Sequence, residues 1–138
     1  MGKLCNNIVS RTAKIWDVET GKVKQTLPGH SHAVAVLSMP NGIVITGSQD
    51  KKIRIWFKGN MEREIDAHGD IIRDFSEVPG IGFVSCSNDE TVKLWTLDGQ
   101  NLAELKGHNG FIFSVTTLDS GEIVSTSDDK TAKIWRDG

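Results

Sequence analysis

The feature that most constrains the fold is a tryptophan that returns about every 40 residues. Tryptophan occupies positions 16, 56, 95 and 135, and histidine recurs with nearly the same period at positions 30, 68 and 108. The aspartates at 50, 89 and 129 each stand six residues before a tryptophan. A fixed period of this length is typical of repeat proteins, in which each copy forms one structural unit and packs on the next.

Each tryptophan ends a segment that reads as a short β-strand. The five residues Lys52–Trp56 alternate polar and apolar side chains, and this period of two predicts a strand with one buried face. Turn residues such as Pro40-Asn41-Gly42 separate these segments. The first full unit is expected to contain four strands, at Ala33–Met39, Ile43–Ser48, Lys52–Phe57 and Met61–Ile65. Short strands with frequent turns predict an all-β chain of antiparallel repeats.

Composition excludes several function classes. The chain has 138 residues, of which 38% are hydrophobic and 25% charged, as in ordinary globular domains. Sixteen basic and eighteen acidic residues give a net charge of −2 without any basic run, which argues against nucleic-acid binding. No apolar stretch approaches the roughly 18 residues of a membrane helix, and two cysteines make no disulfide framework. We therefore expect an intracellular protein that binds neither nucleic acid nor membrane.

These motifs resemble the WD-repeat β-propeller family. Gly29-His30, Asp50 and Trp56 carry one copy of its signature, and two further copies follow, although only Trp16 is followed by Asp. The resemblance implies a propeller fragment of about three four-stranded antiparallel blades, whose ring this chain alone does not close. The expected division is an irregular stub at 1–11 and blades at 12–138, with repeats at about 17–56, 57–95 and 96–135.

The resemblance also implies a hydrogen-bonded set of four side chains in each repeat. In the family, a turn aspartate bonds a loop histidine, which bonds a serine or threonine that bonds the tryptophan. Carried onto this sequence, the three sets are His30/Thr46/Asp50/Trp56, His68/Ser85/Asp89/Trp95 and His108/Ser125/Asp129/Trp135.

These sets could also be interpreted as catalytic sites, but that interpretation is disfavoured. Histidine, serine and aspartate form hydrolase triads, but triads are defined by geometry and roles rather than residue types. Three copies at one period, each tied to a tryptophan, fit a structural repeat better. His30-Ser31-His32 lacks neighbouring ligands for a metal site, and no glycine-rich phosphate loop is present. We expect no enzyme activity, no catalytic residue, no cofactor and no metal.

The amino-acid sequences of three segments narrow the resemblance to the phospholipase A-2-activating protein family. The segments Ile71–Asp74, Phe83–Gly99 and Gly107–Val115 carry it. That family consists of ubiquitin-binding adaptors in ubiquitin-dependent degradation, which dock on the AAA ATPase segregase through two domains that this sequence does not contain. The resemblance implies ubiquitin binding and a cytoplasmic or nuclear location. The alternatives are a scaffold for another protein or peptide, or a non-functional fragment of a longer propeller.

The candidate partner-binding residues follow from propeller topology. The loops that carry the repeated histidines and aspartates lie on one face of a propeller, where exposed aromatic and aliphatic side chains act as anchors. Phe111 is the first candidate, with packing inside a strand as its alternative. The predicted residues are His32, Gln49, Asp70, Ile71, Asn88, Phe111 and Asp128.

The beginning of the chain departs from the repeat. Ile8–Trp16 matches Ile123–Trp135 only if four residues are removed, and those four include the counterpart of Asp129. Two hypotheses explain the departure. The chain is a truncated, mis-spliced or decayed piece of a longer propeller, or two copies associate to complete a ring of six or seven blades.

Overall fold

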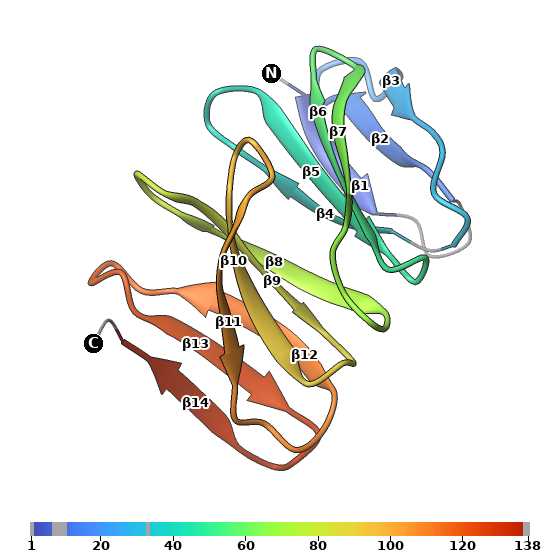
Figure 1. Cartoon of the computed structure of the whole chain (residues 1–138). Helices are drawn as coiled ribbons and strands as arrows, with labels where there is room; N and C mark the ends of the chain where they lie inside the picture. Colours follow the sequence, from blue (N-terminus) through green and yellow to red (C-terminus); the bar gives the residue numbers. More distant parts are fainter. Residues whose placement is uncertain (1, 7–10, 33, 137–138) are drawn as a thin grey trace.

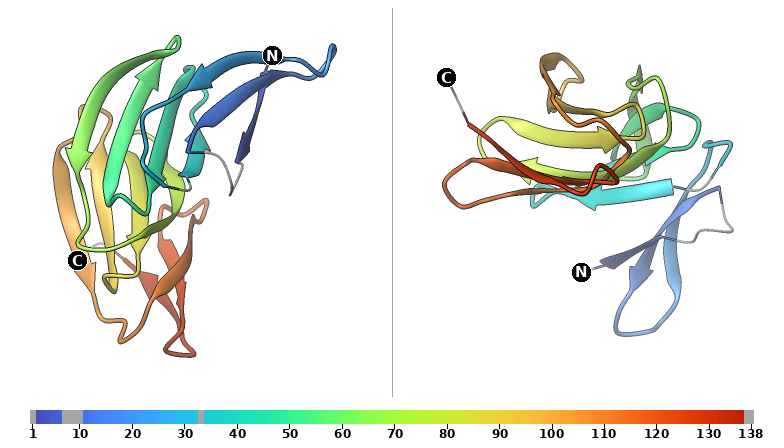
Figure 2. Two further views of the ribbon diagram at one scale, coloured as in Figure 1. Left: turned by 90° about the vertical axis from the view of Figure 1, so that its right-hand side faces the viewer. Right: turned by 90° about the horizontal axis from the view of Figure 1, so that it is seen from below.

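The computed structural model describes residues 2–6, 11–32 and 34–136, and these residues form fourteen β-strands and no helix. The strands make four antiparallel sheets that follow one another along the chain (Figure 1). The all-β propeller fragment predicted from the repeat is confirmed: the sheets follow one another as blades, and no closed ring forms. Figure 2 shows the first and last sheets at opposite ends of the row.

The two central sheets have four strands each and the outer two have three. The strands of the first sheet are β1 (Gly2–Asn6), β2 (Ala13–Asp17) and β3 (Val23–Leu27); those of the second are β4 (Val34–Ser38), β5 (Ile43–Ser48), β6 (Lys52–Phe57) and β7 (Asn60–Asp66). The third sheet contains β8 (Ile72–Val78), β9 (Gly82–Ser87), β10 (Thr91–Thr96) and β11 (Asn101–Lys106), and the fourth contains β12 (Ile112–Thr117), β13 (Ile123–Ser127) and β14 (Ala132–Trp135).

The beginning of the chain differs from the irregular stub expected for residues 1–11. Gly2–Asn6 form strand β1, which pairs antiparallel with β2 so that Cys5 stands opposite Lys14. The whole fragment Ile8–Ser10, which the repeat comparison aligned with a strand, lies with residue 7 outside the described residues. A strand from earlier in the chain therefore takes the place beside β2.

The core lies between successive sheets. Ala13 and Leu27 of the first sheet pack on Val44 and Trp56 of the second. Two further clusters join the second sheet to the third and the third to the fourth, and their largest members include Ile45, Phe75, Phe83, Trp95, Ile112 and Val115. Each sheet thus buries its apolar face against a neighbour, as a repeat array requires.

Inter-sheet polar contacts fix how β8 lies beside β12. The Asp74 carboxylate accepts hydrogen bonds from the Ser114 hydroxyl at 3.0 Å and from the Val115 N–H at 3.1 Å. The Arg73 guanidinium lies over the Phe113 ring, 5.8 Å from its centroid. Both contacts join residues about 40 positions apart, so equivalent positions of consecutive repeats lie side by side.

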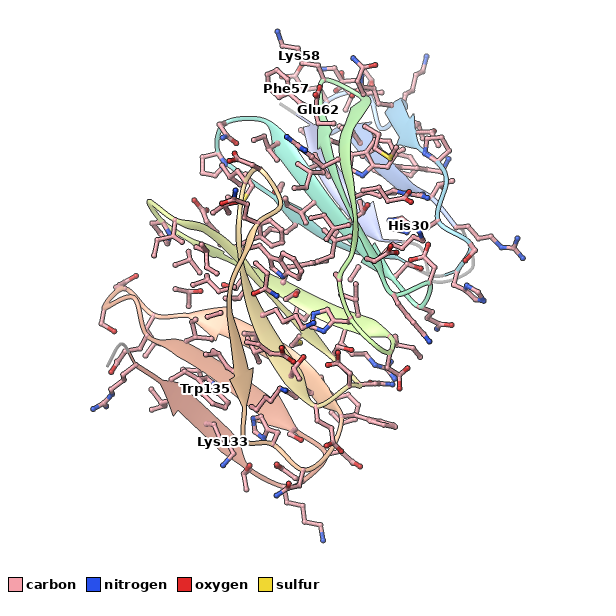
Figure 3. The ribbon with its side chains drawn as sticks, viewed as in Figure 1. His30, Phe57, Lys58, Glu62, Lys133 and Trp135 are labelled. Atoms are coloured by element: carbon pink, nitrogen blue, oxygen red, sulfur yellow. The ribbon has the colours of Figure 1, made fainter. Side chains whose placement is uncertain are left out.

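The turns divide into two opposite faces of the array. The histidine face carries the loops that connect successive sheets and the turns at 49–51, 88–90 and 128–130, whose residues Lys51, Glu90 and Lys130 share a positive φ near 70°. The opposite face carries the turns at 39–42, 79–81 and 118–121, together with those after β6 and β10. In Figure 3, His30 marks the first face and Phe57, Lys58 and Glu62 mark the second.

Candidate functional site

Beneath the histidine face, each of the last three sheets holds one chain of hydrogen-bonded side chains. In the second sheet, His30 Nδ1 lies 2.8 Å from Asp50 Oδ2 and His30 Nε2 lies 2.7 Å from Thr46 Oγ1. The Trp56 indole donates to the same Thr46 oxygen at 2.9 Å. His30, Thr46 and Trp56 are buried, so this series of hydrogen bonds connects a surface loop to the interior of the sheet.

The next two sheets repeat this geometry. His68 lies 2.9 Å from Asp89 and 2.7 Å from Ser85 Oγ, which accepts from the Trp95 indole at 2.9 Å. In the fourth sheet the corresponding distances among His108, Asp129, Ser125 and Trp135 are all 2.8 to 2.9 Å. The structure thus brings together all twelve residues that the resemblance groups into three sets.

In the second sheet, the donors and acceptors fit a neutral His30, whose pKa burial lowers. An indole nitrogen only donates and an ionised carboxylate only accepts. The Thr46 hydroxyl therefore accepts from Trp56 and donates to His30 Nε2, which leaves the histidine proton on Nδ1, facing Asp50. Each aspartate also ties two backbone segments: Asp89 accepts from the N–H groups of Gly69 and Thr91 at 3.0 Å.

Burial and these hydrogen bonds shift the pKa values of His30 and of the three aspartates. Burial lowers the pKa of His30 below its ordinary value of 6.5 and outweighs the opposing effect of Asp50. Burial raises the pKa of Asp50, but hydrogen bonds from His30 and the Lys52 N–H outweigh it and lower that pKa below 3.8. Burial raises the pKa of Asp89, but hydrogen bonds from His68 and Thr91 outweigh it and lower that pKa; hydrogen bonds from Thr131 and His108 lower the pKa of Asp129. In the second sheet, a neutral His30 thus donates to the ionised Asp50 carboxylate.

The first sheet lacks this arrangement. Trp16 stands where Trp56 stands in the second sheet, but its indole nitrogen is buried without a hydrogen-bond partner in the described part of the chain. The register of β1 places Cys5 opposite Lys14, the position that Thr46 takes opposite Arg54. Among the residues that the structure describes around Trp16, none supplies a hydroxyl or a histidine to its indole nitrogen as in the other three sheets.

The geometry of the sets does not provide a nucleophile. The side chains of Thr46 and Ser85 are fully buried, and each oxygen is already shared between a histidine and a tryptophan. A catalytic hydroxyl must face a site that a substrate can enter. These hydroxyls instead lie inside the sheets, so the sets hold the loops of the histidine face in place.

Four of the predicted partner-binding residues form two equivalent pairs on that face. The Asn88 N–H donates to the Ile71 carbonyl and the Asp128 N–H donates to the Phe111 carbonyl, each at 2.9 Å. Phe111 is 45% exposed, so its side chain is available to a partner rather than packed inside a strand. Asp128 is exposed and Ile71 is half-buried.

The remaining predicted residues fit a binding surface unevenly. His32 and Gln49 are exposed, and Asp70 is half-buried. Asn88 is only 6% exposed because its side-chain oxygen accepts from Arg73 Nε at 2.7 Å. Its expected role as a contact residue is therefore corrected: Asn88 positions Arg73.

Sequence reasoning missed two residues of this face, Arg73 and Phe113. Arg73 is exposed, bonded to Asn88 and placed over the Phe113 ring, which is itself 47% exposed. A strict period of two gives no signal here, because the pairing register shifts between Ile112 and Ser114 and leaves both Phe113 and Ser114 exposed between the buried Ile112 and Val115. Phe111 is also exposed and stands two residues before Phe113, at the histidine-face end of β12, and we call these three exposed residues the Phe111 cluster (Arg73, Phe111, Phe113).

Other chemistry is limited in the described residues. They contain no group of three or more metal-ligating side chains. None of them forms a helix that is long and apolar enough to cross a membrane. Cys86 is fully buried, and burial raises the pKa of its thiol. This cysteine acts as a small core residue.

A family model for "WD domain, G-beta repeat" matches the chain at residues 21–56, 59–96 and 99–136. Among curated proteins, the ubiquitin homeostasis protein lub1 of Schizosaccharomyces pombe is 43% identical over 150 residues, covering 80% of this chain and 21% of that protein. Protein DOA1 of Saccharomyces cerevisiae is 32% identical and covers 67% of this chain and 19% of its own length. The nuclear distribution protein PAC1 of Candida albicans is also 32% identical, covering 79% and 24%.

Among solved structures, the crystal structure of the WD40 beta propeller domain of Doa1 matches with a TM-score of 0.85. It is 30% identical, and the match covers 97% of this chain and 46% of that chain. The chain thus spans about a fifth to a quarter of the curated relatives it matches. Both lub1 and DOA1 are orthologues of the phospholipase A-2-activating protein, so the resemblance to that family, predicted from three sequence segments, is confirmed.

Proposed function

The chain belongs to the WD-repeat family, and from that premise we propose that it is a non-catalytic protein-interaction scaffold whose histidine face binds ubiquitin. Two relatives support the choice of ligand, because lub1 is named for ubiquitin homeostasis and the Doa1 propeller matches 97% of this chain. Propellers host many functions, so the surface itself must supply a binding site.

The observation that carries the proposal is the Phe111 cluster. Two half-exposed aromatic rings and an arginine lie together on one face, and these are the residue types that dominate binding energy at interfaces. The backbone bond between Asp128 and Phe111 and the side-chain bond between Asn88 and Arg73 hold the cluster in place. A pre-ordered surface loses less conformational entropy on binding.

The wider role is also part of the proposal. Ubiquitin binding by this chain would place it in ubiquitin-dependent protein degradation, in the cytoplasm or the nucleus, with the AAA ATPase segregase as a partner of the longer relatives. The name of lub1 supports the ubiquitin-related part, and the segregase and the location rest on the family resemblance alone. Because the chain spans only about a fifth of lub1 and DOA1, segregase docking is proposed for a longer protein and not for this chain by itself.

Isothermal titration calorimetry of the chain with ubiquitin tests the proposal. We expect binding of micromolar order, weakened at least about tenfold by Phe111→Ala, because truncating a hot-spot residue costs about 1.4 kcal/mol or more. Phe57→Ala is the matched control, since Phe57 is 39% exposed on the opposite face. Absence of binding, with the variants folded, would refute the ubiquitin proposal.

A general scaffold for another protein is the second candidate. It is favoured if ubiquitin fails while a different protein is retained by the wild-type chain and released by Phe111→Ala. That outcome would keep the Phe111 cluster as the contact surface and change only its ligand.

Self-association is proposed as the way in which the open array completes a ring. The four sheets leave the array unclosed, and propellers close with typically four to eight blades. Size-exclusion chromatography with light scattering is expected to show a discrete dimer. A monomer at about 100 μM, well above the dissociation constants of stable dimers, would contradict self-association and leave the ubiquitin proposal intact.

A further inference from the structure

We propose that the opposite face carries a groove that binds an extended segment of another protein in which basic residues alternate with aliphatic ones. The groove consists of two adjoining hollows that share Glu77, Val78 and Ile81, and we call it the Ile81 groove. It lies away from the histidine face, so it stands or falls independently of ubiquitin binding.

The groove follows from the packing of equivalent turns. One hollow, of about 490 Å³, lies between the turn after β8 and the turn after β12, and it is lined by Pro79 and Leu118 among others. The other, of about 390 Å³, lies between the turn after β4 and the turn after β8, and it is lined by Pro40 and Leu97. Hollows of this size accommodate a few side chains each. Because they adjoin along residues 78–81, an extended segment can occupy both.

The apolar part of the groove is exposed. Ile81 is 48% and Leu118 is 40% exposed, although both are aliphatic, and Val78 is buried beneath them. Turn tips on a soluble protein do not require aliphatic residues for packing. Two such residues beside the same hollow provide an anchoring surface for an aliphatic side chain.

The charged part of the groove is negative on balance, because the three carboxylates of Glu77, Asp119 and Glu122 line it together with one cation, Arg136. Glu77 and Asp119 line it, and neither carboxylate has a hydrogen-bond or ion-pair partner among the described residues. Glu122 is already occupied, because it pairs with Arg136 and accepts from the Ser120 hydroxyl at 2.9 Å. Two free carboxylates beside an apolar wall select a cationic partner over an anionic one.

A buried hydroxyl reinforces this selection. Thr117 Oγ1 is buried without a hydrogen-bond partner in the described part of the chain, and Thr117 lines the same hollow as Glu77. The pairs Arg73–Phe113 and Asp74–Ser114 set β8 and β12 side by side at an offset of 40 residues. Glu77 and Thr117 are also 40 residues apart in the sequence, and each stands three residues after Asp74 and Ser114 on the same two strands.

A lysine ammonium or an arginine guanidinium fits that pair of oxygens. Either group donates several hydrogen bonds and accepts none, so it can bond the Glu77 carboxylate and the Thr117 oxygen together. The aliphatic stem of the same side chain packs along apolar surface. The chemistry of the groove therefore specifies a basic side chain flanked by aliphatic ones.

Two fluorescein-labelled peptides test the proposal, Ser-Leu-Lys-Leu-Arg-Leu-Ser and its acidic match Ser-Leu-Glu-Leu-Glu-Leu-Ser. Titrated into the ¹⁵N-labelled chain, the basic peptide is expected to shift the amide signals of residues 77, 78, 80 and 81 and of residues 117–122. The Glu77→Gln/Asp119→Asn double variant is expected to raise its dissociation constant at least about fivefold, as loss of two charge-assisted hydrogen bonds predicts. Ile81→Ser tests the apolar wall and is expected to weaken binding as well.

Glu90→Gln, on the histidine face, is the control that removes a carboxylate elsewhere and is expected to leave the dissociation constant unchanged. The proposal is overturned if both peptides shift the same amides equally, or if the basic peptide shifts only the histidine face. It is equally overturned if no shift appears at about 1 mM peptide, the weak limit for a specific contact. The indole N–H signals of Trp56 and Trp95 report that each variant remains folded.

Discussion

Replacing Thr46 by valine tests whether the hydrogen-bonded sets hold the sheets together. Valine keeps the shape of threonine and removes only the hydroxyl, which serves two partners at once. The Trp56 indole donates to this hydroxyl at 2.9 Å and His30 Nε2 lies 2.7 Å from it, while all three residues are buried. Thr46→Val therefore leaves one donor and one acceptor unsatisfied in the interior.

The expected loss of stability follows from that count. A buried polar group left without a partner costs about 1–3 kcal/mol, so two such groups make Thr46→Val destabilising by roughly 2–6 kcal/mol. Thr46→Ser is the matched control, because it keeps the hydroxyl and removes one methyl group, which costs about 1 kcal/mol. Comparing the two variants therefore separates the contribution of the Thr46 hydrogen bonds from that of its packing.

Urea unfolding followed by circular dichroism at one protein concentration measures both free energies of unfolding. The valine variant is expected to unfold at least about 1–2 kcal/mol more easily than the serine variant. Equal stabilities would refute the reasoning, because they would show that the shape of residue 46, rather than its hydroxyl, stabilises the sheet. An unchanged dependence on urea concentration verifies that both variants unfold from the same compact state.

Three further predictions concern the stability of the folded chain. Trp135→Phe is expected to cost about 1 kcal/mol more than Trp16→Phe in urea unfolding, because both residues are half-buried but only the Trp135 indole has an acceptor; equal losses would contradict this. Stability is expected to fall as the pH drops below 6.5, because the lowered pKa of His30 makes the unfolded chain take up the proton first. It is expected to fall again below about pH 4, where the unfolded aspartates are protonated while Asp50 and Asp89 stay ionised in the fold; a flat profile would contradict both. Gly82→Ala is expected to cost at least about 3 kcal/mol, because a Cβ there would lie 2.0 Å from the Trp95 carbonyl oxygen, against about 1 kcal/mol for Gly80→Ala in open space at positive φ; similar thermal midpoints would contradict the steric argument.

Local alternation was enough to predict the strands of the repeat. The ranges expected for two strands of the second sheet, Ile43–Ser48 and Lys52–Phe57, are those of β5 and β6. Lys52–Phe57 alternates, while Ile43–Ser48 begins with three apolar residues after a turn and is buried on both faces, so burial determines their structure. The grouping of each histidine with its partners came from the family resemblance, which no local pattern supplies.

What could not be predicted depends on contacts between distant residues. Gly2–Asn6 has no apolar alternation and becomes a strand because it pairs with β2. Asn88 resembles an exposed turn residue, yet it is buried because Arg73 from the preceding strand bonds it. Arg73 in turn meets Phe113 of the next sheet. Pairing and side-chain contacts across sheets follow from tertiary structure and not from the residues of one turn.

Hydrogen exchange of the chain with and without saturating ubiquitin tests the central claim most directly, because it reads both faces in one experiment. We expect slower exchange in the segments around Arg73 and Phe111 on the histidine face, and unchanged exchange at the turns at 79–81 and 118–121. Protection confined to the opposite face, or no protection in either face, would contradict the assignment of the histidine face as the ubiquitin-binding surface.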